Sequence, residues 1–185
     1  MRWKRALSIV RSTRRRGRRP GGFTLIELMI VIVILAVAAA IVVPMASSAA
    51  SMQLRSAANM VAADLEYAKS LAIGTGQRHS VVFDPTAESY QIEDATPAVV
   101  PHPVKKGFSY VIDFSSDSRL DRVNIVSANF NGVSVVGFDY LGSPYSVSGM
   151  TVTALNNTGV ITLQAGGITK TVRVEPVTGF VSISN

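Results

Sequence analysis

Hydrophobic and polar positions divide the chain into three stretches, and the first of them is a continuous apolar run. The run covers residues 23–43, and residues 28–43 contain no polar side chain. As a helix, these 21 residues would be ~31 Å long, which matches the hydrocarbon core of a bilayer. The pattern predicts a transmembrane helix over 23–43.

The second stretch has apolar residues at helical spacing. They recur every three or four positions at Leu54, Ala58, Val61, Leu65, Ala68 and Ala72, which is typical of a helix with one buried face. Polar residues, among them Asp64, lie mostly off this stripe, and Glu66 and Lys69 can pair at i,i+3. We expect one helix over 24–73 that ends at Gly74, with residues 44–76 continuing the membrane segment as an amphipathic helix.

The third stretch, residues 77–185, alternates short apolar runs with turn residues. This pattern predicts a β-rich globular domain. Strands are expected at 79–83, 89–93, 109–114, 124–126, 133–140, 151–155, 160–164, 168–175 and 180–184. A turn is expected at 84–88, and hairpin turns are expected at 156–159, 165–167 and 176–179. Residues 94–107 contain three prolines and are expected to form a mobile loop. The fold class is therefore α+β, a long N-terminal helix packed on an antiparallel sheet or sandwich.

The net charge of +6 belongs to the start of the chain. Residues 1–22 hold nine Lys and Arg residues and no acid, whereas the other 163 residues hold nine basic and twelve acidic side chains. Basic residues keep their side of an apolar helix in the cytoplasm, so residues 44–185 are expected outside it. The charge indicates orientation and does not by itself indicate nucleic-acid binding.

Glu27 is the one charged residue in the apolar run. An ionisable group inside a membrane segment is a functional hypothesis by default. The alternative is an acid tolerated near the interface, where the positive end of the helix dipole favours it. An amine created by cleavage just before Phe23 would be its nearest partner.

The segment Gly21-Gly-Phe-Thr-Leu-Ile-Glu27 resembles the class III signal sequence of type IV pilins and type II secretion pseudopilins. The resemblance implies that residues 1–22 are a leader, which a prepilin peptidase removes after Gly22. It further implies N-methylation of Phe23 and pairing of Glu27 with the Phe23 amine of a neighbouring subunit. Pro44 matches the proline that this family carries along its helix, where it would kink or locally melt the helix.

Two segments further along, 54–73 and 172–181, resemble the GspH/FimT branch, which includes the H-type minor pseudopilins. This resemblance implies a structural subunit of a type II secretion pseudopilus or type IV pilus. Its expected partners are prepilin peptidase, other pilin or pseudopilin subunits and inner-membrane lipid. The C-terminal domain would be periplasmic.

Two other functions stay open. One is a DNA-binding minor pilin for DNA uptake, although Lys105-Lys106 is the only adjacent basic pair beyond the leader. The other is a membrane-tethered domain of unrelated function. An ordinary secretory signal fits poorly, because its apolar stretch would be shorter and free of acid.

Catalytic chemistry is not indicated. The chain has no cysteine, and its two histidines, His79 and His102, are expected to be structural or surface residues. Asp113, Asp117 and Asp121 recur every four residues, but an EF-hand needs a tighter spacing, a glycine and a terminal glutamate. No enzyme activity, metal or cofactor is therefore expected.

Overall fold

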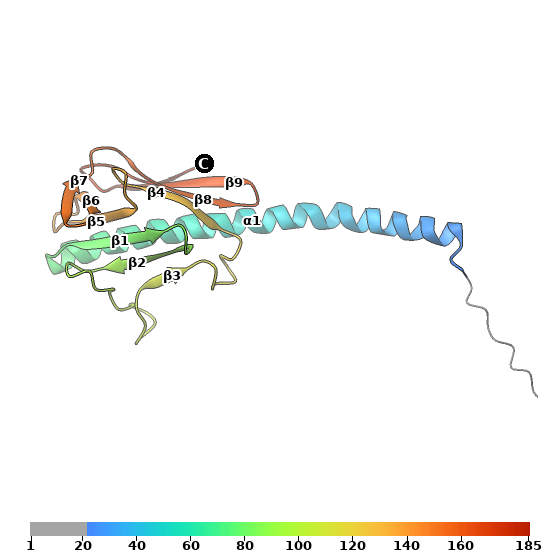
Figure 1. The fold of residues 1–185 in the computed structure, drawn as a ribbon, viewed down its shortest axis with the longest axis horizontal. Helices are drawn as coiled ribbons and strands as arrows, with labels where there is room; N and C mark the ends of the chain where they lie inside the picture. Colours follow the sequence, from blue (N-terminus) through green and yellow to red (C-terminus); the bar gives the residue numbers. More distant parts are fainter. Residues whose placement is uncertain (1–21) are drawn as a thin grey trace, which may run out of the picture. The chain divides into compact units, whose positions relative to one another are not determined.

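The computed structural model describes residues 22–185, and within them the side chains of 22–40 and 49–185. The leader expected over 1–22 lies outside the described residues except for Gly22. Within residues 22–185, one helix, α1 (Leu25–Thr75), precedes ten strands (Figure 1). The chain forms two compact units that divide between Ile41 and Val42. Among the described residues, no helix combines the length and apolar character needed to cross a membrane.

The C-terminal half of α1 buries the predicted stripe. Its six residues, Leu54 through Ala72, are all fully buried, as is Ala57. Glu66 and Lys69 form the expected ion pair at 2.7 Å. The predicted end of the helix is off by two residues, because Gly76, and not Gly74, adopts the left-handed conformation, with φ +67°. The Thr75 hydroxyl donates to the Leu71 carbonyl oxygen at 2.7 Å within the last turn.

The strands form two antiparallel sheets. The six-stranded sheet has the order β3-β2-β1-β5-β6-β7 and the four-stranded sheet the order β10-β9-β8-β4. The bounds are β1 His79–Asp84, β2 Ser89–Glu93, β3 Val111–Asp113, β4 Asn124–Asn129, β5 Val135–Phe138, β6 Pro144–Ser148, β7 Thr151–Ala154, β8 Gly159–Ala165, β9 Ile168–Val174 and β10 Val181–Ser184. The buried cluster combines side chains of α1 and of both sheets, so the predicted α+β fold class is confirmed.

One predicted hairpin turn is wrong. Residues 156–159 join β7 of the six-stranded sheet to β8 of the four-stranded sheet, so they are a crossover between sheets. The other three turns do connect paired neighbours: β1 with β2, β8 with β9, and β9 with β10. Turn residues alone cannot separate the two cases, because a hairpin and a crossover both need a reversal of the chain.

Strand β6 is absent from the sequence prediction. It begins at Pro144, which lies opposite Phe138 of β5 and accepts a hydrogen bond from the Leu155 N–H at 3.0 Å. Proline is tolerated at the first residue of a strand, where the missing donor costs little. Gly142 and Pro144 are residue types typical of loops, so the sequence pattern predicts a loop where β6 begins.

The proline-containing segment 94–107 is held by backbone pairing. Val100 N–H donates to the Ile92 carbonyl at 2.9 Å, Tyr110 N–H to Val100 at 2.8 Å, and His102 N–H to Phe108 at 2.8 Å. The Asp94 carboxylate accepts from the N–H groups of Thr96 and Ala98. The expected mobile loop is thus a hydrogen-bonded arm, whose base continues the pairing of β2.

Candidate functional site

The segment around the expected cleavage position is short and open. Gly22 is exposed, and a Cβ placed on it would meet no atom within 4 Å. Phe23, the expected new N-terminus, is 83% exposed. Both residues precede the first turn of α1. The described part of this segment therefore leaves the Gly22–Phe23 bond accessible.

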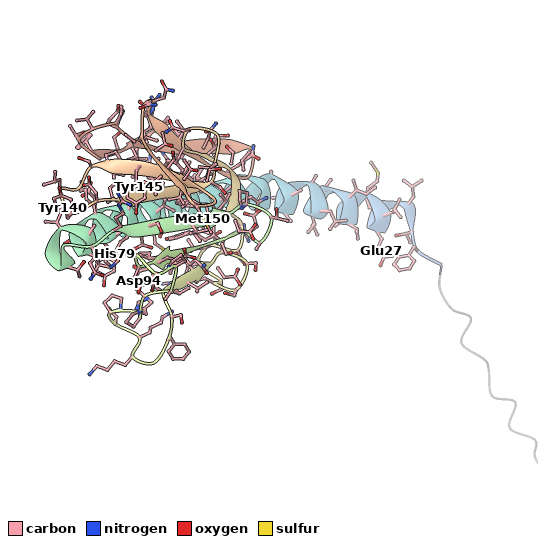
Figure 2. The ribbon with its side chains drawn as sticks, turned by 60° about the vertical axis from the view of Figure 1, so that its left-hand side comes forward. Glu27, His79, Asp94, Tyr140, Tyr145 and Met150 are labelled. Carbon is pink, nitrogen blue, oxygen red and sulfur yellow. The ribbon has the colours of Figure 1, made fainter. Side chains whose placement is uncertain are left out.

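Thr24 caps the start of α1. Its hydroxyl oxygen accepts a hydrogen bond from the Glu27 N–H at 3.2 Å, and its carbonyl accepts from the Leu28 N–H at 3.1 Å. Thr24 and Glu27 have the spacing of a capping box, a signal that the sequence analysis missed. Glu27 thus occupies the first helical turn, where the helix dipole favours a carboxylate (Figure 2).

Large apolar side chains cover the N-terminal part of α1 on every side. Those at residues 25, 26, 28–35 and 37 are between 47% and 77% exposed. A helix with no polar face cannot remain in water, because each exposed aliphatic side chain forgoes roughly 1.5–3 kcal/mol of burial. This part of α1 therefore presents apolar side chains on every face. Pro44 belongs to α1, but its side chain lies outside the described residues, so its expected role stays a prediction.

Asp64 is a buried carboxylate, although the sequence analysis placed it off the buried stripe. Its Oδ2 accepts from the Tyr90 hydroxyl at 2.5 Å and its Oδ1 from the Tyr110 hydroxyl at 2.7 Å. Burial raises the pKa of Asp64, while the two tyrosine hydrogen bonds and the nearby His102 partly oppose that rise. We call these two hydrogen bonds to Asp64 the clamp. They join α1 to β2 and to the arm that leads into β3.

His102 supports the same arm. Its ring stacks on Tyr110 with the centroids 4.8 Å apart, and its Nδ1 accepts from the N–H groups of Val104 and Lys105 at 3.2 and 3.1 Å. His79 is buried at the start of β1, where Nδ1 lies 3.2 Å from the Gln77 carbonyl oxygen. Both histidines therefore have the structural positions that the sequence analysis expected.

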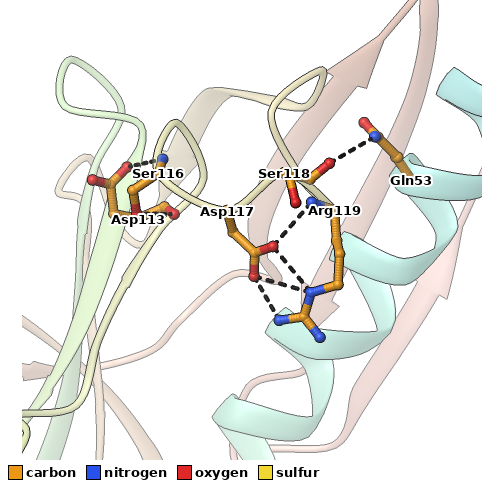
Figure 3. A network of polar contacts seen from close by, with 6 residues as sticks. All are labelled: Gln53, Asp113, Ser116, Asp117, Ser118 and Arg119. Carbon is orange, nitrogen blue, oxygen red and sulfur yellow. Dashed lines mark hydrogen bonds and ion pairs between the residues drawn. The ribbon is translucent and has the colours of Figure 1, made fainter.

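The three regularly spaced aspartates do not converge. Asp117 pairs with Arg119 at 2.6 Å, Asp113 caps the turn at Ser115 and Ser116, and Asp121 accepts from Gln53 of α1 at 3.2 Å. Figure 3 shows Asp113 and Asp117 turned toward different partners. Within the part of the chain that the structure describes, no group of three or more metal-ligating side chains gathers.

Residues 17–43 match the family model described as the prokaryotic N-terminal methylation motif. The fold resembles the minor pseudopilin EpsH of the type 2 secretion system of Vibrio cholerae, with TM-score 0.50 and 11% identity over 71% of this chain and 96% of that chain. The fold is therefore pilin-like, and residues 17–43 carry the N-terminal methylation motif.

The pilin-like chain also matches the type IV minor pilin FimU of Pseudomonas aeruginosa in two crystal forms. These matches have TM-scores of 0.46 and 0.47 and 16% identity, and each covers 71% of this chain. Comparison with curated protein sequences finds no match.

Proposed function

We propose that this pilin-like protein is a minor pilin or pseudopilin, a structural subunit of a type II secretion pseudopilus or a type IV pilus. The observation that carries the proposal is the methylation motif over 17–43, which includes the start of α1 at Leu25 and the exposed apolar side chains on every face of that part of the helix. Such a helix is stored in the inner membrane and transferred into a filament core, because both surroundings cover every face of it. The β-rich domain is then periplasmic and faces outward from the filament.

Processing follows from the accessible glycine. A prepilin peptidase cuts after Gly22, where a Cβ would meet no atom of the described residues within 4 Å, and Phe23 becomes the methylated N-terminus. Cleavage removes a strongly basic leader, and the mature chain then carries a net charge of about −3. A structural role, and not catalysis, fits this processing.

Glu27 sets the register between neighbours. In the apolar core of a filament, its carboxylate and the Phe23 ammonium of an adjacent subunit attract strongly, while either charge alone is penalised. Glu27 is the only acid in the first turn of α1, so a displaced neighbour would leave the amine without a counter-charge.

The mass of the mature protein tests the proposal. The full chain is produced together with its prepilin peptidase, extracted from membranes and analysed by intact mass and N-terminal sequencing. We expect a start at methylated Phe23, and no cleavage in a Gly22→Ile chain. A start near Ser51 would mean removal of the helix by an ordinary signal peptidase. An uncut wild-type chain would favour a tethered domain of unrelated function.

DNA binding is a second candidate, favoured by the end of the arm. Lys105 and Lys106 are exposed there beside Phe108, which is 67% exposed. Adjacent cations with an aromatic ring suit a phosphate backbone and a stacked base. Salt-dependent DNA binding by the detergent-solubilised full chain, lost on changing Lys105, Lys106 and Phe108 to Ala, would establish it. Absence of binding at ~50 mM salt would remove it.

A further inference from the structure

Exposed apolar side chains gather at the end of the globular unit where α1 ends. They are Ile73 of α1, Tyr140 and Leu141 of the β5–β6 turn, and Val177 and Phe180 of the β9–β10 connection, and they are 52–79% exposed. We call these five residues the end patch. Figure 2 shows Tyr140 beside the C-terminal end of α1.

Two close approaches and one hydrogen bond show that the elements of the end patch are neighbours. A Cβ on Gly142 would lie 3.1 Å from Cδ1 of Ile73, and a Cβ on Gly179 would lie 2.7 Å from the Gly142 carbonyl oxygen. The Lys69 ammonium donates to the Gly179 carbonyl at 3.0 Å. The helix end and the two turns are therefore adjacent, and they present one surface.

Both turns are fixed by their own hydrogen bonds. The Asp139 carboxylate accepts from the N–H groups of Leu141 and Ser143 at 2.9 and 2.8 Å. Across the second turn, the Glu175 N–H donates to the Phe180 carbonyl at 2.9 Å and the Gly179 N–H to Glu175 at 3.0 Å. The apolar side chains are thus presented by an ordered backbone, which lowers the entropy lost on docking.

Val177 adds a local cost to this arrangement. Its φ is +67°, a left-handed conformation that is unfavourable for a β-branched residue. Backbone strain of this kind is found preferentially at functional sites. Glycine or asparagine would fill the turn at lower cost, and neither would present a large apolar side chain to a partner.

The size and charge of the end patch indicate its occupant. Five side chains at about 100 Å² each expose roughly 500 Å², less than the ~800 Å² per partner of a stable interface. A contact of this size holds only when a second attachment raises the local concentration. None of the five carries a charge, and the adjacent Lys69 is paired with Glu66, so nucleic acid and anionic lipid headgroups are poor partners.

We propose that the end patch docks the globular domain of another membrane-tethered pilin-like subunit. This inference rests on the proposed function, because the partner's own apolar helix supplies the second attachment. The subunit that covers the end patch presents an uncharged apolar surface of matching size.

Photo-crosslinking in cells tests the inference with the full-length chain. A photoreactive amino acid is placed at Leu141 or Phe180, with exposed Ser127 of β4 as the control position. We expect cross-links from both patch positions to a different pilin-like subunit, at least ~10-fold above the control. Cross-links to lipid alone, to a second copy alone or to no protein would each overturn the proposal.

A pair of variants gives an independent measure. Leu141→Asn combined with Phe180→Ser should lower co-purification of the partner subunit at least ~10-fold, with near-UV circular dichroism unchanged. Met150→Ser, which removes another fully exposed apolar side chain at the β6–β7 turn, is the matched control and should have no effect. Wild-type co-purification by the double variant would overturn the proposal. The mature N-terminus is scored separately, so unprocessed chain counts against the proposed function and missing cross-links count against the end patch.

Discussion

The Asp64 carboxylate accepts a hydrogen bond from the Tyr90 hydroxyl at 2.5 Å in the interior of the domain. A second hydroxyl, that of Tyr110, occupies the other carboxylate oxygen at 2.7 Å. Among the buried side-chain oxygens and nitrogens that the structure describes, none lacks a partner. The clamp joins three segments that are far apart in the sequence, so it should contribute to the stability of the domain.

Replacing Asp64 by Ala should destabilise the domain. The change leaves two buried hydroxyls without an acceptor, and each unsatisfied polar group costs about 1–3 kcal/mol. Urea unfolding of the detergent-solubilised full chain, followed by tyrosine fluorescence, measures the loss. Asp121→Ala, which removes an exposed acid with a single side-chain partner, is the control and should cost under ~1 kcal/mol. Equal effects of the two changes would contradict a special role for the clamp.

The free energy of unfolding should fall in alkali because of Tyr90 and Tyr110. Burial and the Asp64 charge raise the pKa of Tyr90 and of Tyr110 above the ordinary value of 10. Above pH 10 the unfolded chain releases protons that the folded chain retains, so the free energy of unfolding falls as the pH rises. Below pH 10 the contribution of both groups is fully present.

Urea midpoints at pH 8 and pH 11 check this sign. Tyr110→Phe should reduce the difference between the two midpoints, because one protonated phenol is removed. Tyr140→Phe, at an exposed position, should keep the wild-type difference. A midpoint that rises between pH 8 and pH 11 would refute the prediction.

Gly137 should not tolerate a methyl group. A Cβ there would lie 2.2 Å from the ring carbon Cζ of Tyr145, its neighbour across β5 and β6. The Arg78 guanidinium also lies over this ring, 5.5 Å from the centroid, so the ring has little freedom to move. Gly137→Ala should therefore cost about 1–3 kcal/mol.

Gly74 is the matched control for Gly137. It lies in the last turn of α1, and a Cβ there would meet nothing within 4 Å. Gly74→Ala should stabilise the chain by up to ~1 kcal/mol, because alanine loses less backbone entropy in a helix. Thermal unfolding midpoints of both variants and of the wild type measure the two effects. A midpoint of Gly74→Ala below that of the wild type would contradict the prediction.

Local periodicity predicted the helix but not the clamp. The stripe of Leu54, Ala58, Val61 and Leu65 predicts a narrow buried face, and this prediction leaves Asp64 off it. Positions 57, 61, 64 and 68 also have helical spacing, so the buried face is wider than the stripe. The partners of Asp64 lie 26 and 46 residues away, and no local pattern could indicate them.

The order in which the strands pair could likewise not be predicted from local sequence patterns. Short alternating runs located nine of the ten strands, because alternation is a property of each strand alone. The division into two sheets depends on contacts between segments far apart, such as β1 with β5. Among the expected site residues, Gly22, Phe23 and Glu27 were named from a motif, and the described residues place Glu27 in a capped first turn.

Glu27→Gln should separate membrane storage from assembly. The neutral amide makes insertion easier and so keeps the chain in the membrane fraction, but in the proposed filament it would leave the Phe23 ammonium of the neighbour unpaired in an apolar core. Removing one partner of a buried ion pair costs about 3–5 kcal/mol, so the assembled, pelletable fraction should fall at least ~10-fold. Glu66→Gln is the control on the same helix, because its pair with Lys69 is partly exposed and contributes under ~1 kcal/mol. Wild-type assembly of the Glu27→Gln chain would remove charge pairing as the basis of register.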